Sequence, residues 1–276
     1  MRKVLLGALA IAIGASAWWV WHNHHVIKDG LQEYVENGEF LTLEARYTPE
    51  ELMAAHRKEL LPSTQYAFLE PIVKYAPYLL IDSKYNMADK GTKEGVLLWG
   101  LVDGELVLDT ESWERTHGYE DAINVGADRN DFRILFALSK NGGALTRDQL
   151  QNELHLERDT LDPWIDSAIK KHLIVPVGSE LRIHLQDPKI WVVPQTKMAK
   201  SFVRKPYSNS QRLSRKYSKS QIESIAKAAF GSAFSIRSIS EVFLPVYCLC
   251  VKNPDGSTHT SYWNALTGKQ ITNLSL

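Results

Sequence analysis

Residues 95–108 read GVLLWGLVDGELVL, and this stretch decides the fold. Asp103-Gly104 separates two apolar runs there, and an Asp-Gly pair in such a place is a strong hairpin signal, because glycine accepts the positive φ of a tight turn. We predict strands over 95–102 and 105–108, preceded by a strand over 78–85. Four alternate residues of the hairpin and its exit are acidic: Asp103, Glu105, Asp109 and Glu111. A solvated strand face is favoured for them over an acidic site.

Helices are predicted on both sides of this hairpin. Thr48-Pro49-Glu50-Glu51 is typical of a helix start, because Thr caps free amides, Pro suits the first turn and acids suit the helix dipole. We therefore expect a helix over 49–60. A second helix is expected over 65–75, and a short one after Thr110. Residues 29–127 would then form an acidic helix-plus-hairpin module.

Residues 128–187 carry a pattern of three helices followed by a hairpin. The expected elements are helices over 131–138, 147–154 and 159–172 and strands over 173–175 and 181–185. Asn141-Gly142-Gly143 ends the first helix, Thr146 caps the second, and Lys170-Lys171-His172-Leu173-Ile174-Val175 passes from helix into strand. This order resembles a winged helix-turn-helix over about 129–187. The resemblance implies a third helix that enters the major groove of DNA.

The charges of the third helix do not suit that task. Its N-terminal half has Arg158 as its one cation, against Glu157, Asp159, Asp162 and Asp166. Duplex DNA carries about one negative charge per 1.7 Å of axis, so binding depends on cations near the phosphates. We therefore expect this module to contact protein or to serve as a scaffold.

Residues 220–276 predict a small helix-plus-sheet module. The expected elements are a helix over 220–230 stopped by Gly231, strands over 234–239, 242–251 and 257–263, and a turn at Asn253-Pro254-Asp255-Gly256. The ending Tyr262-Trp263-Asn264-Ala265-Leu266-Thr267-Gly268-Lys269 resembles the closing strand and turn of a PepSY-type module, over about 218–271. That resemblance implies a fold common in exported proteins, with a role in contacts to other proteins.

The formal net charge of zero hides a strong asymmetry along the chain. Residues 1–128 hold 11 basic and 20 acidic side chains, whereas residues 188–276 hold 13 basic and 3 acidic ones. We predict that a basic linker, residues 188–219, contacts anionic lipid or nucleic acid through Lys197, Lys200, Arg204, Lys205, Arg212, Arg215, Lys216 and Lys219. The alternative is that this linker lies against the acidic residues of 29–128.

The first 25 residues predict the location of the protein. Met1-Arg2-Lys3 precedes eighteen uncharged residues, 4–21, which as a helix would span about 27 Å of the roughly 30 Å hydrocarbon core. The expected membrane-interface residues are Trp18, Trp19 and Trp21. Because basic residues beside a transmembrane helix favour the cytoplasmic side, Arg2 and Lys3 would place the N-terminus in the cytoplasm. The bulk of the chain would then lie on the other side of the membrane. The alternative is a secreted protein, cleaved after Ala17.

The sequence gives no sign of a reaction. Motifs for dinucleotides, phosphate loops, metalloproteases and serine hydrolases are absent from it. Cys248 and Cys250 would share one strand face about 6.5–7 Å apart, so we expect them buried as small hydrophobic residues rather than disulfide-bonded. Three histidines near the N-terminus, His22, His24 and His25, are favoured as a polar flank over a metal site. We therefore predict no catalytic residue, no metal site and no cofactor.

These observations combine into one prediction of fold and function. The composition, 44% apolar and 23% charged, excludes a wholly disordered or disulfide-dense chain. We predict an α+β protein with a transmembrane helix in 1–25, followed by the modules 29–127, 128–187 and 220–276 and the linker 188–219. The expected function is that of a membrane-anchored, non-enzymatic envelope protein that acts through protein–protein contacts. The alternative is a membrane-tethered, nucleic-acid-binding regulator that uses the winged-helix-like module and the basic linker.

Overall fold

The computed structural model describes residues 38–87, 91–199, 201–208 and 210–272. Two compact units divide the chain, the first with Met1–Phe40 and Arg204–Asn209 and the second with Leu41–Val203 and Ser210–Leu276. In the described part of the first unit, the amide of Tyr207 donates to the carbonyl of Gly38 at 2.9 Å. The fold is mixed α+β, as predicted, with seven helices among the described residues.

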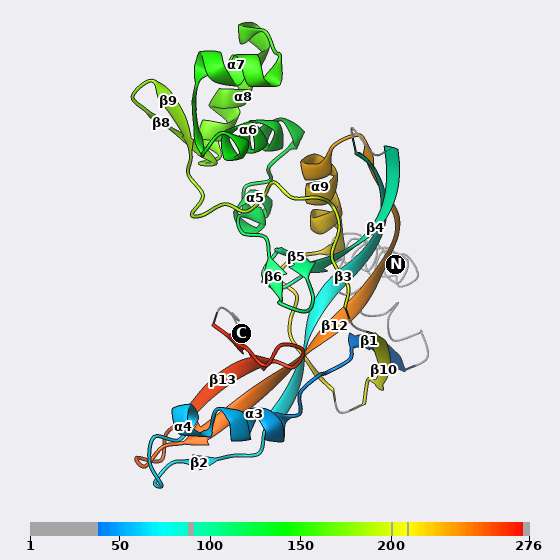
Figure 1. Ribbon diagram of the computed structural model, residues 1–276, viewed down its shortest axis with the longest axis vertical. Coiled ribbons are helices and arrows are strands. Elements are labelled where there is room, and N and C mark those ends of the chain that lie inside the picture. The colour runs from blue at the N-terminus through cyan, green and yellow to red at the C-terminus, as the bar shows by residue number, and fades with distance from the viewer. Residues whose placement is uncertain (1–37, 88–90, 200, 209, 273–276) are drawn as a thin grey trace, which may run out of the picture. The chain divides into compact units, whose positions relative to one another are not determined.

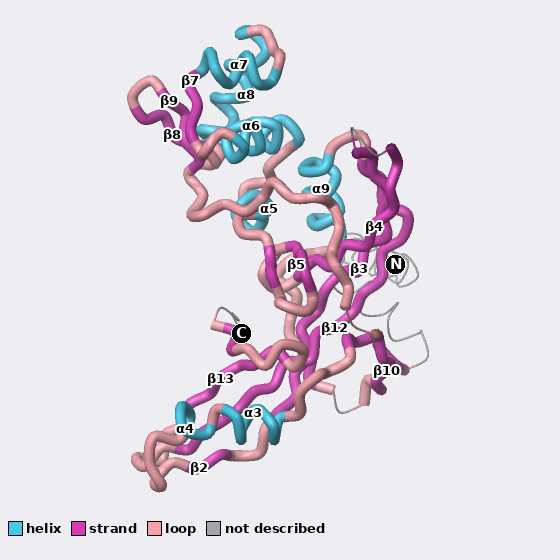
Figure 2. The backbone as a smooth tube through the Cα atoms, in the orientation of Figure 1, coloured by secondary structure: helices cyan, strands magenta, loops and turns pink. Residues whose placement is uncertain are grey.

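Three long antiparallel strands form the centre of the second unit. They are β3 (Ile72–Met87), β4 (Gly91–Gly100) and β12 (Phe234–Lys252), and Figures 1 and 2 show them running side by side. Tyr85 is opposite Phe234 in β12 and opposite Lys93 in β4, so β3 is the middle strand of the three. One sheet therefore contains strands from both the 29–127 and the 220–276 segments.

Shorter strands complete this sheet. They are β1 (Glu39–Leu43), β2 (Ala67–Phe68), β5 (Leu106–Asp109), β6 (Glu114–Arg115), β10 (Phe202–Pro206), β11 (Gln211–Arg212), β13 (Thr258–Asn264) and β14 (Gln270–Ile271). β1 pairs with β12 in parallel, with Thr42 opposite Phe243, and β11 pairs with β3 in parallel. β13 pairs with β12 on one side and with β14 on the other.

The hairpin predicted around Asp103-Gly104 is present. Trp99 in β4 is opposite Leu106 in β5, and Gly104 has a φ of +70°. The indole nitrogen of Trp99 donates to the carbonyl of Gly104 at 2.7 Å. A Cβ on Gly104 would lie 2.9 Å from Cε2 of Tyr217, so both the backbone angle and the packing at this turn require glycine.

Two predicted helices are wrong. Residues 65–75 hold β2 and the start of β3 rather than a helix, because the β-branched and aromatic run from Ile72 continues into a strand that is paired along its length. The segment after Thr110 is a turn that leads into β6. The carboxylate of Asp109 accepts the amide of Glu111 at 2.7 Å there, which is an Asx-type turn that competes with helix formation.

The helix start at Thr48 is confirmed. Thr48 accepts the amide of Glu51 at 3.2 Å, and the Glu51 carboxylate accepts the amide of Thr48 at 2.8 Å. This reciprocal pair is a capping box, which satisfies two amides at the helix start. The helix is divided in two at His56, into α3 (Pro49–Ala55) and α4 (Arg57–Leu60).

A helical module, residues 128–187, contains the elements predicted for it. These are α6 (Arg129–Lys140), α7 (Arg147–Leu154), α8 (Arg158–Lys170), β8 (Ile174–Val177) and β9 (Glu180–Ile183). The sequence missed β7 (Ala144–Thr146), which makes a three-stranded sheet in the order β7-β9-β8. The elements occur in the predicted order, while the kinship with winged helices stays a prediction.

The C-terminal segment also follows its pattern in outline. The helix α9 (Lys219–Phe230) is capped by Ser218 and ends at Gly231. The two strands predicted over 234–251 are one strand, β12, with a register shift between Ile236 and Ser238. A bulge of this kind accommodates an extra residue without ending the strand, which is why one strand replaces two.

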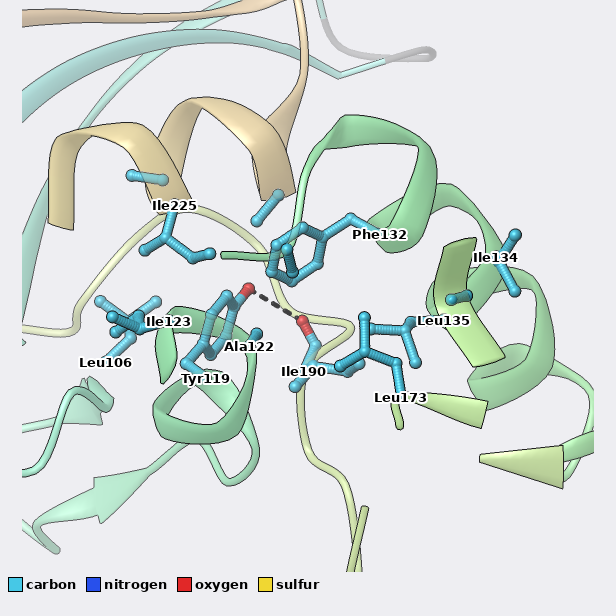
Figure 3. Packing of buried hydrophobic residues seen from close by; sticks show 14 of the residues in the cluster. Leu106, Tyr119, Ala122, Ile123, Phe132, Ile134, Leu135, Leu173, Ile190 and Ile225 are labelled. Carbon is cyan, nitrogen blue, oxygen red and sulfur yellow. Dashed lines mark hydrogen bonds between the residues drawn. The ribbon is translucent and has the colours of Figure 1, made fainter. Parts of the chain in front are cut away.

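One apolar cluster joins the sheet to α9 and to the helical module. Tyr119, in α5 (Tyr119–Asn124), packs edge-on against Trp99, with ring centroids 5.0 Å apart, and lies 5.7 Å from the ring of Phe132 in α6. Figure 3 shows Tyr119 beside Phe132 and Ile190, and the hydroxyl of Tyr119 donates to the carbonyl of Ile190 at 3.0 Å. The helical module and the sheet therefore share buried residues.

Among the described residues, none of the helices has the length and apolar character needed to cross a membrane. The predicted span, residues 4–21, and its interface residues Trp18, Trp19 and Trp21 lie outside the described residues. The membrane anchor therefore stays a prediction from the sequence.

Candidate functional site

The basic linker is paired in part with acidic side chains elsewhere in the second unit. The ammonium group of Lys197 lies 3.1 Å from a carboxylate oxygen of Asp109, and that of Lys216 lies 2.6 Å from Glu120. Arg215 pairs with Glu241 of β12, and each of these two side chains is 16% exposed. Three of the eight cations predicted to contact a polyanion thus bind carboxylates of this chain.

The other predicted cations are arranged differently. Arg204 and Lys205 are exposed in β10, and neither has an ion pair within the described chain. Lys219 is exposed at the start of α9. Arg212 lies over the ring of Phe243, with 6.0 Å between its Cζ and the ring centroid. Lys200 lies outside the described residues.

Tyr217 shows how tightly the C-terminal end of the linker is held. Its side chain is buried, and its hydroxyl lies 3.0 Å from the amide oxygen of Asn124 and 3.3 Å from Glu120. Burial is the main reason why the pKa of this phenol is raised. The pairing with Glu120 raises the pKa of Lys216, so this ammonium group keeps its charge over the physiological range. Tyr217 therefore packs within the fold and offers no ring to an external strand.

The N-terminal end of the linker, residues 188–199, is an apolar connector on the surface of the second unit. Ile190 is buried, and Val192 packs against the same core. The residue that follows each of them is exposed: Trp191 is 60% exposed and Val193 is 47% exposed. An extended chain points successive side chains to opposite sides. The connector therefore buries one face and presents Trp191 and Val193 on the other.

Hydrogen bonds hold both ends of this connector. Lys189 and His117 pair through their backbones, with the amide of Lys189 2.8 Å from the carbonyl of His117. At the other end the buried Thr196 donates its amide to Val96 at 2.7 Å and its hydroxyl to Val107 at 2.6 Å. The hydroxyl oxygen also accepts the amide of Leu98 at 2.8 Å. Trp191 and Val193 are thus presented from a fixed backbone.

The four acids of the hairpin do not form one site. Asp103 pairs with Arg115, and Asp109 pairs with Lys197. Glu105 is buried, and its carboxylate accepts the amides of Gly118 and Glu120 at 2.9 and 3.0 Å, at the start of α5. Burial raises the pKa of Glu105, and the hydrogen bond from Thr116 offsets part of this rise. This capping role has no local signal in the sequence, because the two amides lie more than ten residues from Glu105 along the chain.

Several charged groups of the helical module form ion pairs within the module. Arg147 of α7 lies 2.6 Å from Asp162 of α8, and Arg158 lies 2.7 Å from Asp148. Lys171 binds both Asp131 and Asp128 at the start of α6. On α8 the exposed ionisable side chains beyond Arg158 are Asp159, Asp166 and Lys170. This surface offers few cations for the phosphates of a duplex.

The cysteines match the prediction of small buried residues only in part. Cys248 is buried, Cys250 is half-buried, and both are free, with 3.7 Å between their sulfur atoms. Burial is the main cause that raises the pKa of Cys248 to about 11, so its thiol is protonated and a poor nucleophile at neutral pH. In the described part of the chain, the His, Cys, Asp and Glu side chains form no cluster suited to a metal ion.

The comparisons with known families, with curated proteins and with solved structures found no match to this chain. Any functional argument therefore depends on the residues themselves.

Proposed function

We propose that this protein is a membrane-attached, non-enzymatic protein of the cell envelope that acts by binding another protein. The observation that carries the proposal is the connector, where Trp191 and Val193 are exposed on a backbone held at both ends. Tryptophan is enriched among residues that dominate protein interfaces. A rigid backbone also lowers the conformational entropy lost on binding.

Single exposed apolar residues are common on protein surfaces and need no partner to explain them. Two features distinguish Trp191 and Val193 from such residues. They alternate with Ile190, which is buried, and Val192, which is partly buried, so they share one face of an extended segment. Their exposure is also higher than that of most other apolar side chains in the described chain, where Leu69, for example, is 42% exposed.

The alternative function, a tethered nucleic-acid-binding regulator, has less support. The arginines of α7 and α8 are engaged by Asp162 and Asp148, and three cations of the basic linker are engaged by carboxylates. Among the described residues, the exposed linker cations with no ion pair are Arg204, Lys205 and Lys219, and they are the remaining support for the alternative. The experiment below therefore includes nucleic acid as an outcome.

Site-specific photo-crosslinking in native membranes tests the proposal. A photoreactive residue is placed at Trp191, at Val193 or, as a control of similar exposure, at Leu69. We expect positions 191 and 193 to crosslink to one and the same protein, and position 69 not to do so. Trp191→Ser should then reduce the crosslink from position 193 by about tenfold or more, as for a residue that dominates an interface.

Two outcomes would contradict the proposal. Crosslinks from 191 and 193 to nucleic acid would favour the tethered regulator, and equal crosslinking at all three positions would indicate random contact. The membrane placement has its own test in a reporter fused after Leu276. We expect a reporter that works only outside the cytoplasm to be active, and activity of a cytoplasm-specific reporter would overturn that placement.

A further inference from the structure

A pocket of about 220 Å³ lies apart from the connector, where β3 and β12 meet the turn before β6 and the β13–β14 hairpin. Its apolar lining includes Ala76, Leu244 and Ile271. This volume is below the roughly 300–1,000 Å³ of sites for drug-sized ligands. The pocket therefore suits a small ligand of about ten non-hydrogen atoms, which is a size well below the drug range.

Asn264, on the wall of this pocket, has an unpaired donor. The residue is 1% exposed, and its Oδ1 accepts the amides of Leu266 at 2.8 Å and Thr267 at 3.4 Å. Its Nδ2 is buried and has no hydrogen-bond partner in the described chain. Flipping the side-chain amide of Asn264 would not give Nδ2 a partner, because the backbone amides of Leu266 and Thr267 need an acceptor oxygen where Oδ1 lies. A buried unpaired donor is costly, so it points to an acceptor supplied by a ligand.

The charges at the pocket also favour an acceptor-rich ligand. Asp103 has both carboxylate oxygens engaged, one by the amide of Glu105 at 3.2 Å and the other by Arg115. Arg115 keeps further N–H donors beyond that pair, because a guanidinium group has five. Lys269 lines the pocket, is exposed, and has no ion pair within the described chain. One acid and two bases leave a formal charge of +1.

The position of the Asp103 carboxylate depends on a glycine in β4. A Cβ on Gly100 would lie 1.9 Å from Oδ1 of Asp103, so only glycine leaves room for this carboxylate. Asp103 in turn orients Arg115, which lines the pocket with it.

Two aromatic side chains form one wall of the pocket. Tyr78 and Trp113 pack edge to face, with ring centroids 5.6 Å apart and an angle of 81°. Trp113 has a φ of +57°, which is rare for a bulky residue and is held only where the surroundings require it. Such sites of backbone strain cluster where ligands bind.

We propose that this pocket binds a small monocarboxylate with a planar apolar body. The carboxylate accepts hydrogen bonds from Nδ2 of Asn264 and from Arg115, with Lys269 adding its charge, and the body lies against Trp113. A single net positive charge suits a monoanion better than a phosphate dianion. This inference is independent of the protein-binding role proposed above, because the connector and this pocket have no residue in common.

The test uses the full chain in detergent, with phenylacetate as the probe and phenylacetamide as its uncharged match. Binding is measured by tryptophan fluorescence and by the rise in melting temperature. We expect phenylacetate to bind with a Kd below about 1 mM and the amide to bind at least about tenfold more weakly. Trp113→Phe should abolish the fluorescence change and leave the thermal effect, which would place the ligand at this wall.

Two variants separate binding from folding. Asn264→Asp keeps an oxygen for the turn amides but replaces the donor with a negative charge, so affinity should fall by about tenfold or more. Lys269→Gln changes an exposed residue and should weaken binding by about two- to fivefold. Lys252→Gln, exposed on β12, is the matched control and should leave Kd unchanged.

The proposal is overturned by any of three results. The first is equal affinity for phenylacetate and phenylacetamide. The second is a Kd within about twofold of the wild-type value in both Asn264→Asp and Lys269→Gln. The third is the absence of saturable binding of phenylacetate, benzoate and isovalerate up to about 10 mM.

Discussion

The central sheet and the helical module satisfy their charges in different ways. In the helical module the partners both belong to the module, as Arg147 and Asp162 or Lys171 and Asp131 do. In the sheet region several pairs join the first half of the chain to the basic linker, as that of Asp109 and Lys197 does. The module can therefore neutralise its charges alone, whereas the acidic first half of the sheet region needs the basic linker. Opposite charges in the two halves of a sequence can thus reflect an internal partner.

The largest expected effect tests whether the two regions unfold together. Trp99 is fully buried in the cluster that joins them, and it contacts Tyr119 and the carbonyl of Gly104. Trp99→Ala should lower the free energy of unfolding by about 3–5 kcal/mol. Denaturant unfolding, followed by both fluorescence and far-UV circular dichroism, measures this loss.

Trp191→Ala is the control for Trp99→Ala, because Trp191 is exposed, and its effect should stay within about 0.5 kcal/mol. If Trp99→Ala leaves the helical signal with its wild-type midpoint, the two regions do not share one cooperative core.

The second largest loss of stability is expected from Asp131→Ala, and it should be confined to the helical module. Asp131 is 1% exposed, accepts the amide of Asp128 at 2.8 Å and binds Lys171. Asp131→Ala removes both contacts and should cost about 1–3 kcal/mol, less than a fully buried ion pair because Lys171 keeps Asp128 as a partner. Hydrogen exchange should then quicken in α6–α8 and change little in β3 and β12.

Arg158→Ala is the matched control in the same module. Its pair with Asp148 is well exposed, so the loss should stay within about 0.5 kcal/mol. Similar losses in Asp131→Ala and Arg158→Ala would show that the burial of Asp131 does not matter.

The stability of the sheet region should depend on pH through Glu105. Burial raises the pKa of Glu105 in the folded chain above its unfolded value, despite hydrogen bonds from Thr116 and two amides that oppose the shift. Between those two pKa values the folded state binds more protons than the unfolded state, so this group makes stability fall as pH rises through that window.

Glu105→Gln should remove this slope, because it keeps an oxygen for the amides of Gly118 and Glu120 but has no charge to bury. Urea unfolding at several pH values between 4 and 8 gives the free energy of unfolding at each pH, and hence the slope. A slope of equal steepness in the variant would assign it to another group.

The smallest effects distinguish the two kinds of linker cation. Lys197→Gln with Lys216→Gln breaks the exposed ion pairs to Asp109 and Glu120, so the melting temperature should fall, by an amount that matches up to about 1 kcal/mol per pair. Arg204→Gln with Lys205→Gln removes exposed cations and should leave the melting temperature unchanged. The second pair should instead weaken sedimentation with anionic vesicles, where each cation adds about 1 kcal/mol.

Sedimentation that is unaffected by Arg204→Gln with Lys205→Gln would contradict the prediction of a polyanion-contacting linker. It would then favour the alternative, in which this linker serves the fold.

Local patterns in the sequence were enough to predict many elements. The Asp103-Gly104 turn, the caps at Thr48 and Thr146 and the stop at Gly231 depend on residues within a few positions of each other. Residues 65–75 were misread as helix because their strand state depends on pairing with β12, more than 150 positions later. The same reason explains why the sequence did not reveal that β12 is one long strand.

The candidate sites were harder to predict than the elements. The eight cations were found by composition, but composition cannot show that Lys197 lies beside Asp109 or that Glu105 caps α5. Trp191 could have been noticed, because it lies in the apolar run 190–193 of an otherwise polar linker, although its exposure depends on how Thr196 attaches the connector to β4 and β5. The pocket at Asn264 combines residues from 76 to 272, which no local pattern brings together.

The pairing of β3 with β12 also sets an order of events during synthesis. Tyr85 leaves the ribosome long before its partner Phe234, and at about 5–20 residues per second the delay is roughly 7–30 s. The β3–β4 hairpin can form at once, but one edge of β3 then waits without its neighbour. An open strand edge is prone to pair with other chains. The nascent chain should therefore need a chaperone, or delayed folding of β3, more than the folded protein does.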